Sequence, residues 1–150
     1  RDRLRSRGLG DVYKRQAGYV FGYTVFNDLS ARTMQKAHQQ WFRGKSLDGF
    51  APMGPWIVTA DEIPFPPALD LTSRVNGQTR QRGNTRDMIF GVGEILAELS
   101  RGMTLEAGTI LATGTPAGVA MGMDRPRFLQ AGDVVECEIQ RIGILRNIIR

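Results

Sequence analysis

Three short segments of the chain carry side chains that could bind an anion or a divalent cation. In the first, Asn27 to Gln35, Asp28 ends a strand-like run and is followed closely by Arg32. A carboxylate can ligate a hard cation while a guanidinium or an amide contacts an anionic oxygen. Taken alone, an Asp and an Arg at a strand end are more often a structural ion pair, so this segment needs support from the others.

The other two segments offer positive charge, hydroxyl groups and backbone amides. Arg43 to Ser46 presents Lys45 directly after a glycine, which frees the backbone at that point. Thr113 to Pro116 contains Gly114 and Thr115, and hydroxyl and amide donors of this kind hold carboxylates or enolates. Each segment is weak evidence by itself, and only the three together indicate a binding site.

Generic catalytic motifs, such as a Walker sequence or a nucleophile elbow, are absent from the sequence. The single cysteine, Cys137, excludes an internal disulfide and a thiolate metal cluster, and its strand-like surroundings favour a buried, unreactive thiol. The single histidine, His38, excludes a site with several histidine ligands and is more typical of a surface or packing role than of a general base. Glu136 and Glu138 project to one face of a predicted strand, where a solvated polar face is a better interpretation than a cation site.

The net charge of +5 and the pI near 10.0 raise the question of nucleic-acid binding. Residues 1–16 hold six of the 20 basic and two of the 15 acidic residues, so the rest of the chain is nearly neutral. This segment has no helical or alternating apolar period and resembles translated adapter or vector sequence. We therefore predict a non-native leader over residues 1–16, a domain over residues 17–150, and no nucleic-acid partner.

Length and composition are those of one ordinary globular domain. The chain has 150 residues, of which 41% are hydrophobic and 23% charged. No apolar run approaches the roughly 18 to 20 residues that span a bilayer, and no signal-peptide pattern is found. The sequence thus predicts no membrane segment and a cytoplasmic location.

The hydrophobic patterns predict a strand-rich α+β or mostly β roll with one main helix. Asn76-Gly77 between two alternating runs predicts a hairpin, and apolar residues at helical spacing predict the helix, with Gly102 just beyond its end. The predicted elements, in chain order, are a strand at 19–26, a short turn or helix at 30–35, a long loop at 39–58, the hairpin at 68–81, the helix at 87–100, a strand from 105 that leads into the 113–116 loop, and two strands around Gly143.

Five blocks of sequence resemble, in order, the fumarylacetoacetate hydrolase family. They are GYTVFNDLSAR, QWFRGKSLDGFAPMGPWIV, VNGQTRQRGNTRDMIF, MTLEAGTILATGTPAGV and GDVVECEIQRIGILRN, and they extend from about Gly18 to Asn147. The resemblance implies the mixed, mostly β-roll catalytic fold of that family, usually as a homodimer. It also implies Mg²⁺ or Mn²⁺ and a small α-keto or 1,3-diketo acid as substrate, since the metal stabilises an enolate while a C–C bond breaks or a proton moves.

The resemblance also implies roles for individual residues. Asp28 matches a metal ligand, while Arg32 and Gln35 match substrate-contacting positions. Lys45 matches a lysine that lies near the metal and the substrate and neutralises developing negative charge. In the pair Gly114–Thr115, the threonine matches the residue that holds the keto-acid carboxylate, and the glycine allows a close approach.

The sequence departs from the family pattern at the metal site. Relatives carry two glutamates, spaced by one residue, well upstream of the position of Asp28, but the first glutamate in this chain is Glu62. The region where relatives have a lid and a histidine-centred base is not found either, and Thr33 stands where many relatives have an acidic residue. We therefore expect the chain to be the C-terminal part of a longer enzyme and to be inactive by itself.

The expected activity of the enzyme is hydrolysis of a C–C bond in an acylpyruvate or a related diketo acid. The alternative within the family is an isomerase or decarboxylase of the 2-hydroxyhepta-2,4-dienedioate type in aromatic catabolism. The alternative of another class is a truncated, non-catalytic fragment, because one hard ligand cannot hold Mg²⁺ against water.

Overall fold

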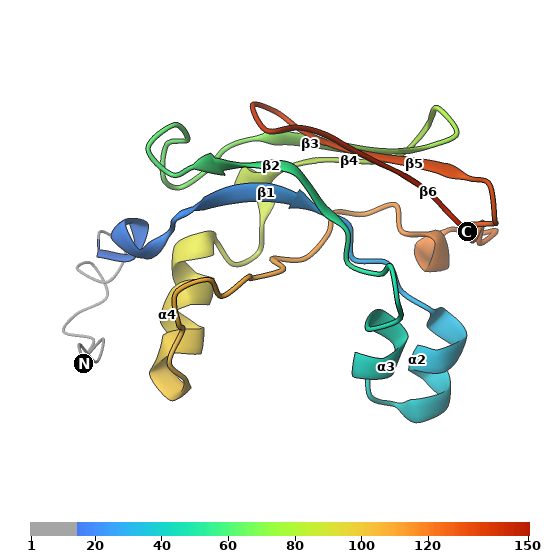
Figure 1. The fold of residues 1–150 in the computed structure, drawn as a ribbon, viewed down its shortest axis with the longest axis horizontal. Coiled ribbons are helices and arrows are strands. Elements are labelled where there is room, and N and C mark those ends of the chain that lie inside the picture. The colour runs from blue at the N-terminus through green and yellow to red at the C-terminus, as the bar shows by residue number, and fades with distance from the viewer. Residues whose placement is uncertain (1–14) are drawn as a thin grey trace.

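Two antiparallel sheets form the centre of the molecule, and helices project from one side of them (Figure 1). The computed structural model describes residues 15–150, so most of the predicted leader at 1–16 lies outside the described residues. Strands and short helices alternate with long irregular segments, which confirms the α+β, mostly β fold class. The elements are η1 (Ala17–Tyr19), β1 (Gly22–Phe26), α2 (Arg32–His38), α3 (Phe42–Lys45), β2 (Met53–Thr59), β3 (Asp70–Val75), β4 (Gln78–Asn84), η2 (Thr85–Asp87), α4 (Val92–Gly102), η3 (Ala120–Gly122), β5 (Val134–Ile139) and β6 (Gly143–Ile148).

The smaller sheet pairs β1 with β2, two strands that lie far apart in the sequence. Gly22 is opposite Thr59 and Phe26 is opposite Met53, with an irregularity in the register between Tyr23 and Val25. The predicted strand at 19–26 is confirmed only from Gly22 onward, because residues 17–19 form a 3-10 turn.

The predicted loop at 39–58 is wrong for two of its parts, which form α3 and β2. The glycines and prolines of this segment indicated a loop, but Trp56, Ile57 and Val58 are good strand formers, and Val58 pairs with Tyr23 of β1. Pro55 is tolerated because β2 is an edge strand of this sheet.

The larger sheet has the strand order β4-β3-β5-β6 and confirms the predicted hairpin and the predicted last two strands. Asn76 and Gly77 form the turn between β3 and β4, and both have a positive φ, 51° and 77°, as a type I′ turn requires. Glu136 Oε1 lies 3.6 Å from Arg146 Nε on the neighbouring strand β6, and Glu138 accepts a hydrogen bond from Arg74 of β3 at 2.8 Å. Both glutamates are therefore paired with arginines on a polar face, as interpreted from the sequence.

A small apolar core lies between the two sheets. Its buried side chains are Val25, Val58, Ile63, Leu69, Ile142 and Leu145. Cys137 of β5 is partly buried and packs against this core, and burial raises the pKa of its thiol. Because the thiolate is the nucleophilic form, this environment agrees with the predicted unreactive cysteine.

The predicted helix at 87–100 exists, but it begins five residues later, at Val92, and extends through Gly102. Glu94 determines the start, since its Oε2 accepts a hydrogen bond from the backbone N–H of Gly91 at 2.8 Å and so caps the helix. The predicted strand from residue 105 is wrong. Residues 103–119 form no helix or strand, and Ile110 is 58% exposed because no described strand pairs with this segment.

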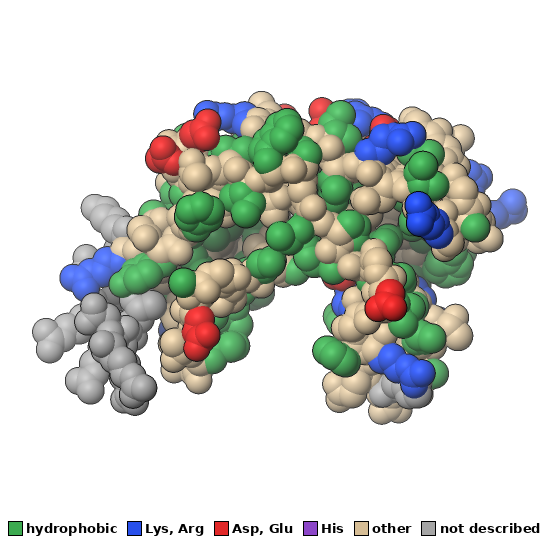
Figure 2. All heavy atoms as spheres, in the orientation of Figure 1, with side chains coloured by type: hydrophobic (Ala, Val, Ile, Leu, Met, Phe, Trp, Pro, Cys, Tyr) green, Lys and Arg blue, Asp and Glu red, His purple; other side chains and the backbone are tan. Residues whose placement is uncertain are grey.

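None of the helices in residues 15–150 is long and apolar enough to cross a membrane. The helices form two separate projections on the same side of the sheets, α4 on one and the pair α2 and α3 on the other (Figure 1). Figure 2 shows the surface hollowed between these two projections.

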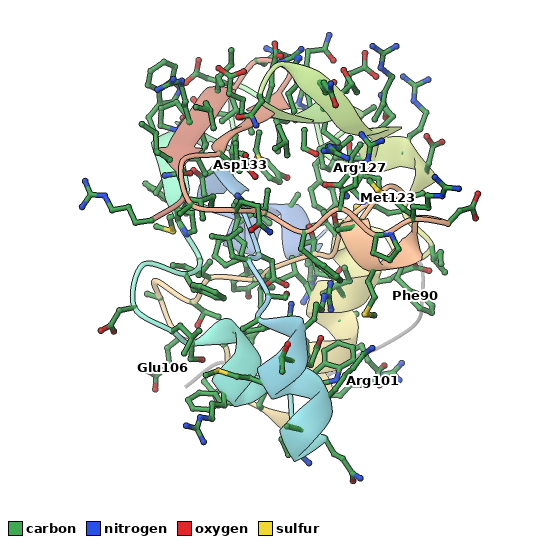
Figure 3. The ribbon with its side chains drawn as sticks, turned by 90° about the vertical axis from the view of Figure 1, so that its right-hand side faces the viewer. Phe90, Arg101, Glu106, Met123, Arg127 and Asp133 are labelled. Carbon is green, nitrogen blue, oxygen red and sulfur yellow. The ribbon has the colours of Figure 1, made fainter. Side chains whose placement is uncertain are left out.

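Asp133 links the turn of the β3–β4 hairpin to the start of β5, beside the sheets and away from α2 and α3 (Figure 3). Its carboxylate accepts hydrogen bonds from the backbone N–H of Gln130 and from Asn76 Nδ2, both at 2.8 Å. These donors hold the pKa of Asp133 below its usual value of 3.8, the Gln130 N–H having the largest effect. The charged carboxylate thus stabilises the fold above this usual pKa, and this contribution is lost as the pH falls through the lower pKa of the folded state.

We expect Asp133→Asn to lower the melting temperature at neutral pH, and the difference from the wild type to shrink as the pH falls below about 3.8. Thermal melting between pH 2 and pH 7 measures this effect. Asp124→Asn, which neutralises an exposed carboxylate of the 120–129 segment, is the matched control. Parallel pH curves for Asp133→Asn and the wild type would contradict the argument.

Candidate functional site

Asp28 and Lys45 form an ion pair between the end of β1 and the last residue of α3. Asp28 lies two residues beyond β1, and Lys45 Nζ donates to its Oδ2. The two side chains are 43% and 26% exposed, respectively, so both can be reached from solvent. The structure therefore brings together the predicted metal ligand and the predicted charge-neutralising lysine.

The position of Lys45 depends on the glycine before it. Gly44 is buried against α2, and its carbonyl accepts a hydrogen bond from the backbone N–H of Ala31 at 2.8 Å. A Cβ atom at Gly44 would lie 3.0 Å from Gln35 Cβ and 3.1 Å from the Ala31 carbonyl oxygen. The absence of a side chain at Gly44 allows this close contact between α2 and α3, which together we call the α2–α3 lobe.

The lobe is closed at its base by a backbone hydrogen bond. Asn27 donates its N–H to the Pro52 carbonyl at 3.0 Å, just before β2 begins. The chain therefore leaves the small sheet after β1, forms the lobe and returns to pair as β2. This path holds Asp28 at the junction between sheet and lobe.

Arg32 and Gln35 interact with each other inside the lobe. Arg32 Nη1 donates to Gln35 Oε1 at 2.7 Å, and Gln35 is only 7% exposed. The amide nitrogen Nε2 of Gln35 is buried and has no hydrogen-bond partner among the described residues, and the same is true of Asn27 Nδ2. Because an unpaired buried donor is costly, these two amides mark a place where an acceptor oxygen is expected.

The aromatic ring of Trp41 lies next to the lysine. Lys45 Nζ is 6.0 Å from the centroid of the ring, at the outer limit of a cation–π contact. Sequence analysis did not identify either Trp41 or the unpaired amide of Asn27, since neither residue type is a signal by itself.

The Thr115 loop, residues 113–118, lies on β4 of the larger sheet. Gln81 Nε2 donates to Thr115 Oγ1 at 2.7 Å and to the Pro116 carbonyl at 2.8 Å. Gly114 is exposed and has a φ of 98°, a conformation that favours glycine. Gln81 was not identified from the sequence, because a lone glutamine on a strand carries no functional pattern.

Within residues 15–150, no hydrogen bond or ion pair joins the Thr115 loop to Asp28, Arg32, Gln35 or Lys45. The six predicted site residues thus fall into two groups, four at the lobe and two in the loop. Two open surface depressions, one around η1 and one at the start of α4, are lined by none of these six residues.

The described residues do not fit a complete divalent-cation site. Nowhere in residues 15–150 do three or more His, Cys, Asp or Glu side chains gather closely enough to hold a metal ion. At the lobe, Asp28 is a single carboxylate and is already paired with Lys45. Magnesium and manganese ions need several oxygen ligands, so Asp28 alone cannot hold either ion.

The chain is similar over most of its length to known proteins. A family model described as "Fumarylacetoacetate (FAA) hydrolase C-terminal" matches residues 6–150. The oxaloacetate tautomerase YisK of Bacillus subtilis is 52% identical over 129 residues, which are 86% of this chain and 43% of the relative.

Solved structures show the same fold. A structure named fumarylacetoacetate hydrolase, from Exiguobacterium antarcticum, is 52% identical with a TM-score of 0.89, and the match covers 91% of this chain and 49% of that one. A 2-hydroxyhepta-2,4-diene-1,7-dioate isomerase from Mycobacterium marinum is 40% identical with a TM-score of 0.81, over 91% and 50% of the two chains. The chain therefore spans about half the length of the relatives that it matches.

We expect Gly44→Ala to destabilise the α2–α3 lobe, because the added methyl group would press on the backbone at Ala31 and Gln35 and force both to shift. Overpacking of this kind costs about 1 to 3 kcal/mol. Amide hydrogen exchange should become faster in α2 and α3 and stay unchanged in β5 and β6.

Gly102→Ala is the control for this substitution. Gly102 ends α4 with no atom within 4 Å of the added methyl group, so the change should be neutral or slightly stabilising. Equal exchange rates in the lobe of Gly44→Ala and of the wild type would contradict the packing argument.

Proposed function

The chain belongs to the fumarylacetoacetate hydrolase family, and on this basis we propose that it forms part of an enzyme that acts on a small 2-keto acid through an enolate. The observation that carries the proposal is the α2–α3 lobe. It carries the guanidinium group of Arg32 next to Gln35, whose buried amide nitrogen is unpaired, and the ammonium group of Lys45, which pairs with Asp28. Positive charge and amide donors together suit a ligand with a carboxylate and a neighbouring keto oxygen.

Each lobe residue has a distinct proposed role. The planar guanidinium of Arg32 binds a carboxylate oxygen, and Gln35 donates its unpaired N–H to a second ligand oxygen. The ammonium of Lys45 lies where it stabilises the negative charge that develops on an enolate oxygen. Thr115 and Gly114 hold the substrate carboxylate with a hydroxyl and a backbone amide.

The proposal for Asp28 is that it supplies one oxygen ligand to Mg²⁺ or Mn²⁺. When bound, such an ion would supply Lewis-acid stabilisation of the enolate. Because the described residues do not complete a cation site, the roles above are derived for the side chains of this chain alone.

The first candidate reaction is hydrolysis of an acylpyruvate. Water adds to the acyl carbonyl, the C–C bond breaks, and a carboxylic acid and the enolate of pyruvate form; the enolate then takes up a proton. The second candidate is isomerisation, in which a proton leaves one carbon and returns to another atom of the same enolate. The second is favoured by the tautomerase and isomerase names of two relatives, and decarboxylation of a related dicarboxylate would pass through the same enolate.

A homodimer belongs to the proposal as well. Large apolar side chains are exposed on β2 and just before β1, among them Trp56 of β2 at 61% and Phe21 at 75%, and exposed apolar surface of this kind is typical of protein contacts. Sedimentation should show a species of twice the 16.7 kDa mass of the chain. The cytoplasmic location and the absence of a nucleic-acid partner stay predictions.

A chimera tests the reaction. The 129 matched residues of the Bacillus subtilis tautomerase would be exchanged for those of this chain, and proton NMR would follow acetylpyruvate and oxaloacetate in the presence of Mg²⁺. Release of acetate and pyruvate supports hydrolysis, and faster keto–enol exchange of oxaloacetate alone supports isomerisation. A folded chimera that does neither would contradict the proposal.

Within an active chimera, we expect Lys45→Met to lower kcat by about 100-fold or more with little change in KM, because Lys45 acts on charge that develops during the reaction. Arg32→Met should mainly raise KM, since it removes a contact to the substrate carboxylate. Lys36→Met is the matched control, because Lys36 is an exposed lysine of α2 without an assigned role. Equal kcat values for Lys45→Met and Lys36→Met would exclude the proposed role of Lys45.

A further inference from the structure

Gln81 of β4 joins the Thr115 loop to the larger sheet through three hydrogen bonds. Its Nε2 donates to Thr115 Oγ1 at 2.7 Å and to the Pro116 carbonyl at 2.8 Å. Its Oε1 accepts from Ser73 Oγ of β3 at 2.9 Å. Both donors and the acceptor of the amide are used, so the side chain is held from three sides.

These contacts determine how the Thr115 hydroxyl is used. A carbonyl oxygen can only accept, so the Pro116 carbonyl requires the NH₂ side of the Gln81 amide to face the loop. Thr115 Oγ1 is therefore an acceptor toward Gln81, and its own hydrogen points elsewhere. Among residues 15–150 no group accepts that hydrogen, and Thr115 is exposed. The hydroxyl is thus presented to solvent as a donor.

The backbone of the loop lies tightly against β4 on either side of Gln81. A Cβ atom at Gly118 would lie 2.1 Å from the Arg80 carbonyl oxygen, and one at Gly83 would lie 3.0 Å from Pro116 Cβ. Gly118 also has a φ of 107°. The loop therefore has no space to move closer to the strand, and the Gln81 amide contacts Thr115 within this tight packing.

We propose that Gln81 is a positioning residue, which holds Thr115 so that its hydroxyl donates to a carboxylate of the substrate. This inference rests on the proposed function of the Thr115 loop as a carboxylate site. It assigns to the β3–β4 hairpin an indirect role in substrate binding, in which Ser73 and Gln81 act through Thr115.

The test uses oxalate as the probe and the 150-residue chain, with affinity measured by NMR titration without metal. We expect Gln81→Ala to weaken oxalate binding about tenfold, the effect of losing one hydrogen bond to a charged group. Thr115→Val should weaken binding to a similar extent. In the double variant the two effects should not add, since both remove the same hydrogen bond.

Two further variants separate positioning from general stability. Gln81→Glu keeps the acceptor for Ser73 but cannot donate to the Pro116 carbonyl when ionised, so it should not restore binding. Gln78→Ala removes an exposed glutamine from the same strand and should leave oxalate affinity unchanged. Circular dichroism would show that each variant keeps the fold.

Amide exchange of residues 113–118 distinguishes the proposed role of Thr115 from the proposed role of Gln81. Faster exchange in Gln81→Ala, together with weaker oxalate binding, is the expected result. Faster exchange with unchanged oxalate affinity in both Gln81→Ala and Thr115→Val would overturn the carboxylate role of Thr115 and, with it, the role of Gln81. Unchanged exchange and affinity in Gln81→Ala, with weaker binding in Thr115→Val, would overturn the inference about Gln81 alone.

Discussion

The close contact of Gly44 with α2 is the constraint on which the candidate site depends. It places α3 directly against α2, and Lys45, the next residue, then reaches the carboxylate of Asp28 at the end of β1. A larger residue at position 44 would separate the two helices and move the ammonium group away from the strand end. At the small sheet, the backbone hydrogen bond from Asn27 to Pro52 joins the two ends of the segment that contains the lobe. The packing of Gly44 thereby helps to place the ammonium group of Lys45 beside the carboxylate of Asp28.

The second half of the candidate site depends on a different sheet. The Thr115 loop is attached to β4 through Gln81, while Asp28 and the lobe follow β1 of the smaller sheet. The two sheets are held together by the small apolar core around Val25, Val58 and Leu145. A substrate that contacts both groups therefore needs this core to keep the two sheets in a fixed position relative to each other. The proposed function therefore links the stability of the core to the binding of a keto acid.

Local signals in the sequence were sufficient for the parts of the fold that local chemistry determines. Asn76-Gly77 predicted the hairpin because only such residues adopt a type I′ turn readily, and the strand-like sequence on either side of Gly143 predicted β5 and β6. The start of α4 was misplaced because Glu94 caps the helix at Gly91, a contact that apolar spacing does not show. β2 was missed because its pairing with β1 is long-range, and the strand expected from residue 105 finds no partner. Family motifs located Asp28 and Lys45, whereas Gln81 became visible only through its hydrogen bonds.

The central claim is that residues 15–150 provide the anion-binding side chains of a keto-acid site but only one ligand of a complete cation site. Thermal melting of the chain with Mg²⁺ or Mn²⁺, with and without oxalate, beside Asp28→Ala, tests it most directly. A complete site occupied at about 100 times Kd would raise the melting temperature by roughly 5 to 10 °C. The account predicts that the metal adds no shift beyond that of oxalate alone. A metal-dependent shift of this size that Asp28→Ala abolishes would contradict it.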